Sequence, residues 1–189
     1  MNLFLEALNK PADAFKRGNR KVSWILVALT IGVVAIFDPL LQTFVNGTGV
    51  AKPIDGLQIV WLSAAGIGTY ILICTIFWII GKIFGSLTTL QTYIRTWGIS
   101  YFPTLLCAII VAVTENYFFL FWNSIIWAMF FNVVFVGILI WKATLYVLFF
   151  KEVAKLNRGK LIGAIILGIL AIIILAWINA FIGLKTPIL

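Results

Sequence analysis

Five long apolar runs constrain this chain more than any other feature of its sequence. Each approaches or exceeds the roughly 20 residues that a helix needs to cross a hydrocarbon layer about 30 Å thick, and the charged residues are confined to short segments. With 63% hydrophobic and 11% charged residues, the composition lies far from that of a soluble domain. The strict alternation of apolar and polar residues that indicates a membrane β-barrel is absent. The sequence therefore predicts an all-α integral membrane protein.

Backbone groups in lipid must form hydrogen bonds within their own segment, so each run is expected to be helical. We predict an amphipathic cytoplasmic arm over residues 1–21 and a five-helix membrane domain over residues 22–189. The predicted spans are 22–45, 59–80, 97–113, 127–150 and 161–182. Residues 118–150 are one apolar run, too long for one untilted helix, so we assign residues 117–126 to a shallow or re-entrant segment. The alternative is a sixth, partial crossing, which would change the topology.

Lysine and arginine are distributed unevenly between the two sides of this bundle. Of the 14, eleven fall in the arm, in the loop after the second span and in the hinge after the fourth. Lys52 and Lys185 lie on the opposite side, and Lys142 lies within the fourth span. Because short cytoplasmic loops hold the excess of positive charge, we expect the N-terminus in the cytoplasm and the C-terminus outside.

The hinge after the fourth span is a candidate surface for lipid or a protein partner. Its basic residues are Lys151, Lys155, Arg158 and Lys160. The first three would share one face if the helix continued to Leu156, beside the basic residues of the arm. Each cation near an anionic leaflet contributes about 1 kcal/mol of attraction, so we expect anionic headgroups or an acidic partner here. The alternative is that these charges only fix the orientation during insertion.

Other classes of function find little support in the sequence. The basic residues form no groove with interleaved aromatics, which argues against nucleic acid binding. The chain has no histidine, its six carboxylates lie in separate segments, and it carries neither a P-loop nor a Gly-rich dinucleotide turn. Cys74 and Cys107 fall in apolar spans, where small buried hydrophobes are the ordinary role. We therefore expect no enzyme activity, no catalytic or metal-binding residue and no cofactor.

Asp38 and Lys142 are the ionisable residues well inside the predicted spans, where each costs about 2.5–3.5 kcal/mol at mid-bilayer. Asp38 precedes Pro39, and the pair can simply end the first span near the outer interface. Lys142 can extend its ammonium group towards the cytoplasm. The alternative is that Lys142 faces the bundle interior, paired with a carbonyl, a carboxylate or a lipid phosphate. An intramembrane enzyme that uses one of these two residues stays open.

Residues 86–96, between the second and third spans, alternate apolar and polar residues at three- and four-residue spacing. This spacing predicts a short helix that lies in the membrane interface. We expect Tyr93 and Trp97 to anchor it at headgroup depth.

The segment GKIFGSLTTLQTYIRTWGISYFPTLLCAIIVAV, residues 81–113, resembles the central signature of the Yip domain family, the Ypt/Rab-interacting membrane proteins. That signature has a Gly after the second span, a short interfacial stretch, and then a Gly followed five residues later by a Pro that opens the third span. Gly85, Gly98 and Pro103 match it. The resemblance implies a multi-pass membrane protein in which these three residues have structural roles, with Pro103 bending or breaking the helix.

The ends of the chain extend the resemblance and also limit it. Pro11 and Phe15 resemble the family's opening Pro and Phe. However, Ile99 stands where an aromatic usually follows the Gly, and the long polar N-terminal region and Asp-Leu-x-Gly-Pro stretch of eukaryotic members are missing. The chain thus resembles a compact prokaryotic member, expected in the cell membrane, and the departures argue against binding of small GTPases.

Taken together, these features predict a non-enzymatic multi-pass scaffold that organises the membrane or binds a protein partner, with anionic membrane lipids as expected ligands. The alternative is a small transporter or lipid-handling protein that uses Lys142 and Asp38. That alternative requires the two side chains to line a common cavity near the middle of the membrane.

Overall fold

The computed structural model describes residues 9–45 and 56–182. Five helices in these residues are long and apolar enough to cross a membrane, and the described part of the chain contains no strand. The predicted all-α, five-span class is therefore confirmed. Lys52, Lys185 and the first eight residues of the predicted arm lie outside the described residues.

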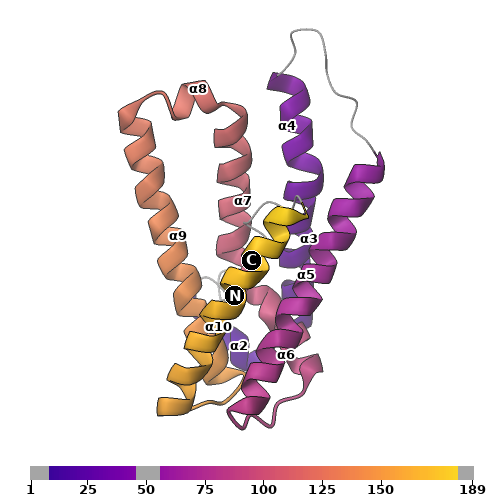
Figure 1. The fold of residues 1–189 in the computed structure, drawn as a ribbon, viewed down its shortest axis with the longest axis vertical. Helices are drawn as coiled ribbons and strands as arrows, with labels where there is room; N and C mark the ends of the chain where they lie inside the picture. Colours follow the sequence, from indigo (N-terminus) through magenta and orange to yellow (C-terminus); the bar gives the residue numbers. More distant parts are fainter. Residues whose placement is uncertain (1–8, 46–55, 183–189) are drawn as a thin grey trace.

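The spans are longer than predicted, and two of them are built from several helical segments (Figure 1). The first span stacks α3 (Arg20–Gly32), the π-helix η1 (Val33–Phe37) and α4 (Asp38–Val45). The second is α5 (Gly56–Ile83), and the third joins α6 (Leu90–Thr96), the 3₁₀-helix η2 (Trp97–Ser100) and α7 (Tyr101–Asn116). The last two are α9 (Ile125–Glu152) and α10 (Arg158–Phe181). Two short helices, α2 (Pro11–Arg17) and α8 (Phe118–Phe121), complete the described fold.

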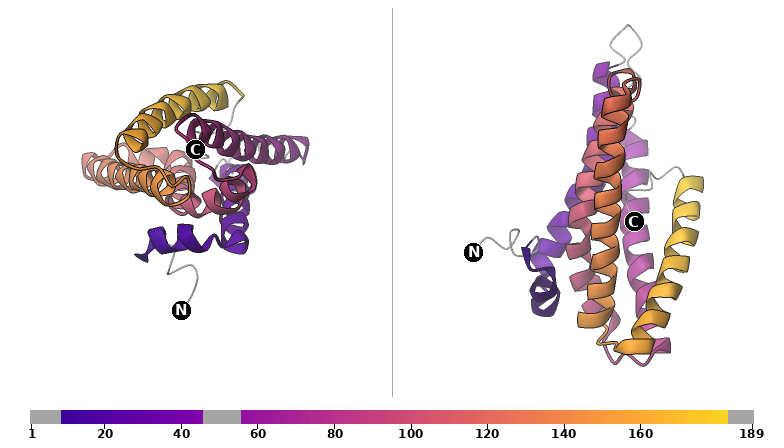
Figure 2. Two further views of the ribbon diagram at one scale, coloured as in Figure 1. Left: turned by 90° about the horizontal axis from the view of Figure 1, so that it is seen from below. Right: turned by 90° about the vertical axis from the view of Figure 1, so that its left-hand side faces the viewer.

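The N-terminal helix α2 packs across the lower part of the bundle, against the end of α9 (Figure 2). Its apolar side is buried through Ala14 and Phe15, and the Phe15 ring meets the edge of Phe149 with ring centroids 5.7 Å apart. The helix ends at Gly18, which has a φ of 60° and donates its N–H to the Ala14 carbonyl. A short amphipathic segment is thus fixed to the bundle by one large aromatic side chain.

The first span continues through Asp38 and Pro39 to Val45, the predicted end of the span. The reading in which this pair ends the helix is therefore wrong. The π-helical turn η1 lies immediately before the pair, over Val33–Phe37. Pro39 has no N–H to donate and its ring crowds the carbonyl one turn earlier. A widened turn accommodates such a residue without ending the helix.

The third span begins with the predicted short helix, which the structure places over Leu90–Thr96. A 3₁₀ turn over Trp97–Ser100 then separates it from α7, with Pro103 in the first turn of α7. The placement of two aromatics was wrong, because Tyr93 and Trp97 are both fully buried in the bundle. They are parts of the core and do not form an exposed belt at headgroup depth.

Residues 117–124 connect α7 to α9 at the upper end of the bundle, through the single turn α8, and residues 125–126 already belong to α9 (Figure 1). They do not make a sixth crossing. The 28-residue helix α9 takes up most of the long apolar run that follows.

The main core lies in the lower half of the bundle and is largely aromatic. Its largest fully buried side chains include Trp97, Tyr70, Tyr93, Phe77 and Phe149. Their rings meet mostly edge to face, for example Phe149 on Trp97 at 4.7 Å and Phe77 on Trp97 at 4.8 Å between centroids. Edge-to-face pairs contribute about 0.5–1.5 kcal/mol each beyond the burial of their area. This core fixes the lower ends of the helices relative to one another.

Candidate functional site

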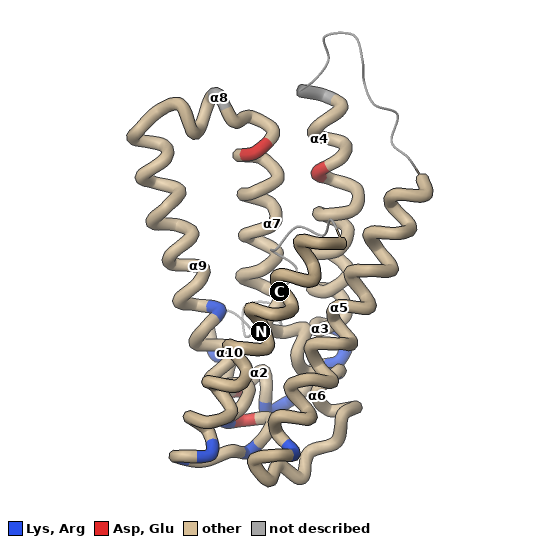
Figure 3. Tube along the Cα trace, viewed as in Figure 1, with Lys and Arg blue, Asp and Glu red and all other residues tan. Residues whose placement is uncertain are grey.

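Charge is separated along the bundle (Figure 3). Except for Lys142, all Lys and Arg residues in the described part of the chain gather toward the end formed by α2, the α5–α6 loop and the α9–α10 hinge, which we call the basic end. The acidic residues of α4 and α7 lie toward the opposite end, which we call the α8 end. The candidate sites therefore fall into three groups: the basic end, Lys142 and Asp38.

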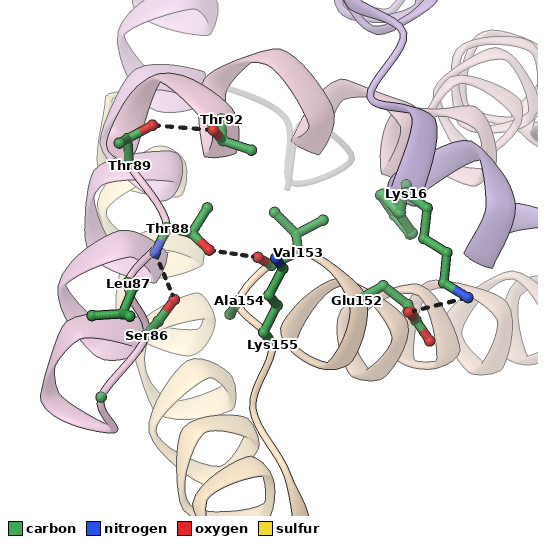
Figure 4. Close-up of a pocket in the computed structure, with 12 residues that line it drawn as sticks. Lys16, Ser86, Leu87, Thr88, Thr89, Thr92, Glu152, Val153, Ala154 and Lys155 are labelled. Atoms are coloured by element: carbon green, nitrogen blue, oxygen red, sulfur yellow. Dashed lines mark hydrogen bonds and ion pairs between the residues drawn. The ribbon is translucent and has the colours of Figure 1, made fainter.

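A cleft of about 620 Å³ opens at the basic end, between α2, the α5–α6 loop and the end of α9 (Figure 4). This volume lies in the range of small-molecule sites. The polar side chains that line it are Lys16, Ser86, Thr88, Thr89, Thr92, Glu152 and Lys155. Four hydroxyls and three charged groups around one cleft form an arrangement suited to a polar, charged ligand.

Helices α5 and α9 both end at this cleft. A residue with a positive φ follows each of them, a glycine after α5 and a lysine after α9. At the end of α5, Gly85 has a φ of 89°, and the Ser86 N–H donates to the Gly81 carbonyl at 2.8 Å. Glycine is the usual residue at such a position because it has no Cβ. At the end of α9, Lys155 has a φ of 55°. A non-glycine residue in this conformation costs about 1–2 kcal/mol, and Lys155 lines the cleft.

The hydroxyls of the α5–α6 loop are held by short contacts. The Thr88 hydroxyl donates to the Val153 carbonyl at 2.8 Å, which links the loop to the end of α9. The Thr88 N–H donates to Ser86 Oγ at 3.3 Å, and the Thr89 and Thr92 hydroxyls lie 3.1 Å apart. One wall of the cleft is therefore a preformed row of side-chain hydroxyls (Figure 4).

The charged wall is formed by two lysines and one carboxylate, with a third lysine at the rim. Lys16 Nζ lies 3.5 Å from Glu152 Oε2, and Figure 4 shows this pair at the α2 side of the cleft. Lys155 is exposed and lines the cleft from the hinge. Lys160 reaches the rim, since its Nζ lies 3.4 Å from the point where a Cβ on Gly85 would stand. With one carboxylate against two ammonium groups in the lining and a third at the rim, the cleft is positively charged.

The spacing of the basic residues predicts one continuous helical face through the hinge, and the structure does not have it. Helix α9 ends at Glu152, before Leu156, and Asn157 lies just before α10 as its N-terminal flanking residue. Lys151 is therefore on α9, Lys155 is in the turn, and Arg158 opens α10 with a φ of 47°. The left-handed turn at Lys155 separates the four basic residues, and of the four Lys155 lines the cleft.

Lys142 faces the interior of the bundle and is 7% exposed. Its ammonium group donates to the Ser100 carbonyl at 3.1 Å and to the Thr104 hydroxyl. The rings of Trp97, Tyr101 and Tyr146 surround it, at 4.9 to 5.7 Å from nitrogen to centroid. Carbonyl and hydroxyl acceptors together with ring faces offset the cost of burying this nitrogen. The lysine thereby joins α9 to the start of α7.

Asp38 is also buried, at 4% exposure, and accepts a hydrogen bond from Asn116 Nδ2 at 2.9 Å. Asn116 lies at the end of α7, twelve residues after Thr104, the partner of Lys142. At 1.5 Å per residue, the two sites are separated by roughly 18 Å along α7. Asp38 and Lys142 therefore have separate partners and do not meet in one site.

The three residues matched to the family signature each occupy a distinct local position. Gly85 takes the left-handed conformation at the end of α5. Gly98 lies against α3, where an added Cβ would meet Ser23 Oγ and the Ser23 carbonyl oxygen. The Gly98 N–H donates to Tyr70 Oη at 3.1 Å. Pro103 lies three residues after the 3₁₀ turn, where its missing N–H favours an interruption. We propose that all three serve the packing of the basic end.

Sequence reasoning missed the hydroxyl wall and the Lys16–Glu152 pair. The run Ser-Leu-Thr-Thr-Leu-Gln-Thr over residues 86–92 contained the signal. The spacing predicts a helix over residues 86–96, whereas residues 86–89 are non-helical and the Thr88 hydroxyl donates to the Val153 carbonyl at the end of α9.

Comparisons with known proteins agree with the sequence signature. The family model of the Yip1 domain matches residues 5–179, nearly the whole chain. No curated protein and no solved structure matched.

Proposed function

We propose that this chain, which belongs to the Yip1 domain family of multi-pass membrane proteins, is a non-enzymatic scaffold that gathers anionic lipid at its basic end. The observation that carries the proposal is the collection of cations from α2, the start of α3, the end of α5, α6 and the hinge at one end of the bundle (Figure 3). Each such cation near an anionic leaflet contributes about 1 kcal/mol. Because the aromatic core fixes these segments relative to one another, their charges act on one patch of membrane.

The orientation that this function requires has the basic end in the cytoplasm. The excess of Lys and Arg at that end supports it. Reporter fusions at Met1 and Leu189 test it, since an odd number of crossings puts the two ends on opposite sides. A cytoplasmic reporter at Met1 and an external one at Leu189 are expected, and the reverse arrangement would contradict the proposal.

Lipid retention tests the function itself. The purified protein, in detergent, is titrated with phosphatidylglycerol or phosphatidylcholine of identical acyl chains, and bound lipid is counted by native mass spectrometry. We expect phosphatidylglycerol to bind several-fold more tightly. The triple variant Lys151→Gln, Lys155→Gln, Arg158→Gln keeps the basic arm and hence the topology, and is expected to lose most of that preference. An unchanged preference would mean that the hinge charges act only during insertion.

The alternative function, a small transporter or lipid-handling protein that uses Lys142 and Asp38, has weaker support. Such a protein needs polar groups that converge near the middle of the membrane. The partners of these two residues lie roughly 18 Å apart along α7. We therefore prefer the scaffold.

A further inference from the structure

We propose that the cleft at the basic end is a specific site for the phosphate of a membrane lipid, and that it prefers a phosphomonoester headgroup such as that of phosphatidic acid. This inference rests on the proposed function, because the basic end must face an anionic leaflet. It goes further by assigning one headgroup chemistry to one cleft.

The cleft offers the donors that a phosphate needs. Lys155 lines it, Lys160 reaches its rim at Gly85, and Lys16 lies across from them, paired with Glu152. The hydroxyls of Ser86 and Thr92 supply neutral donors from the opposite wall. Hydrogen bonds from ammonium to phosphate oxygens are about twice as strong as neutral ones. A phosphomonoester presents three terminal oxygens and up to two charges, so it engages both walls better than a diester with two terminal oxygens and one charge.

The rim of the cleft indicates that the ligand is a lipid. Leu87 lines the cleft and is 92% exposed, and Ile83, at the end of α5, is 66% exposed. Leu87 thus exposes an apolar side chain at the polar cleft, four residues after the end of the membrane-spanning helix α5. A ligand with a phosphate and an acyl chain matches both features, whereas a soluble phosphate matches the polar one alone.

The backbone conformation of Lys155 allows its side chain to be removed without destabilising the fold. Its left-handed backbone, with a φ of 55°, is a position where glycine is preferred. At the neighbouring helix end, Gly85 also has a positive φ and lines the same cleft. Arg158 shares this conformation, so it is the place of Lys155 in the lining of the cleft that assigns its side chain to binding.

Lys155→Gly is therefore the informative variant, and Arg158→Gly is its matched control. Both residues are exposed, both are left-handed, with φ of 55° and 47°, and both substitutions remove one positive charge and relieve the backbone. They differ because Lys155 lines the cleft and Arg158 does not contribute to its lining. Thermal unfolding is expected to show both variants folded and no less stable than the wild type.

The experiment titrates each protein with phosphatidic acid and with phosphatidylglycerol, and counts bound lipid by native mass spectrometry. We expect wild type to bind phosphatidic acid more tightly than phosphatidylglycerol. Lys155→Gly should lower the affinity for phosphatidic acid about tenfold, and Arg158→Gly less than twofold. Equal losses in the two variants would overturn the inference and leave only a general attraction of charge.

Two further arms separate the remaining outcomes. Thr92→Val keeps the charge and shape of the cleft and should lower the affinity for phosphatidic acid about threefold, whereas Thr144→Val, on the exposed face of α9, should not.

Millimolar glycerol 3-phosphate should not displace the lipid. Displacement would show that the ligand is a soluble phosphate ester and overturn the assignment to lipid. Wild type that fails to prefer any anionic lipid to phosphatidylcholine would refute the proposed function itself.

Discussion

The two ends of the bundle are held together in different ways. At the basic end, Phe149 lies against five other rings, and it is fully buried together with Phe77 and Trp97. At the α8 end the buried cluster is small and consists of Val34 and Ala108 with a few partly buried neighbours. There the first turns of α9 expose large apolar side chains, and a partly buried hydrogen bond joins α4 to α7.

This difference matters because apolar side chains in lipid gain little from merely leaving the solvent. Packing between membrane helices depends on van der Waals contact, close approach at small residues and hydrogen bonds. The basic end has all three, and it carries both the cleft and the residues that match the family signature. A binding site is best built on such a rigid support. We therefore expect substitutions at the basic end to cost more stability than comparable substitutions at the α8 end.

The largest effect is expected from Gly98→Ala. An added Cβ would overlap the Ser23 carbonyl oxygen and Oγ, so η2 and α3 would have to separate. We expect a loss of about 3 kcal/mol, at the upper end of overpacking effects, seen as a lower thermal unfolding midpoint in detergent. Gly137→Ala in α9 is the control, because no atom lies within 4 Å of its added Cβ. Similar midpoints for the two variants would contradict the close approach at Gly98.

Phe149→Ala should have the next largest effect. It removes the ring that contacts Phe15, Trp97 and three other aromatics, and leaves a cavity. The cavity alone costs about 2 kcal/mol, at about 24 cal/mol per Å³ of roughly 100 Å³. Phe130→Ala, in the part of α9 near the α8 end, removes a ring that is 54% exposed and should cost far less. Equal losses, measured by the same unfolding assay, would remove the distinction between the two ends.

The same physics explains how much of the fold the sequence could predict. Long apolar runs specify spans because a helix of that length has few alternatives in lipid, and the five-span class was confirmed. The effect of single polar residues and prolines on the helix inside a span was harder to predict. The pair Asp38–Pro39 looked like a helix end, yet a π-helical turn carries the helix past it, and nothing in the spacing of apolar residues signals such a turn.

The candidate site was only partly predictable, because it depends on contacts between distant segments. The abundance of basic residues in the hinge was visible, but the position of each one was not. Periodicity placed Lys151, Lys155 and Arg158 on one face, whereas the left-handed turn at Lys155 breaks that periodicity. The pairing of Thr88 with Val153 across 65 positions of the chain likewise has no signal in a single sequence.

Lys142→Met should have a smaller effect than Phe149→Ala, although it also lies in the lower half. Methionine keeps most of the length and the apolar contacts, but loses the hydrogen bonds to Ser100 and Thr104. Bonds made by charged groups contribute about 1.5–3 kcal/mol each, and relief from burying a charge offsets part of this. We expect a net loss of about 1–2 kcal/mol in unfolding free energy. A gain in stability would mean that the burial of the ammonium group outweighs its contacts.

The smallest effect is expected at the α8 end, from Asn116→Ala. This change removes the hydrogen bond of 2.9 Å to Asp38, whose carboxylate is 4% exposed. A hydrogen bond to a buried charged group would cost more deep in the bundle, but Asn116 is the last residue of α7, where water can take over part of its role. We expect a loss of about 1 kcal/mol. Asn132→Ala, on the exposed side of α9, makes the same chemical change and should alter the unfolding midpoint little. If Asn116→Ala instead costs as much as Phe149→Ala, this one polar contact holds the α8 end as firmly as the aromatic core holds the basic end.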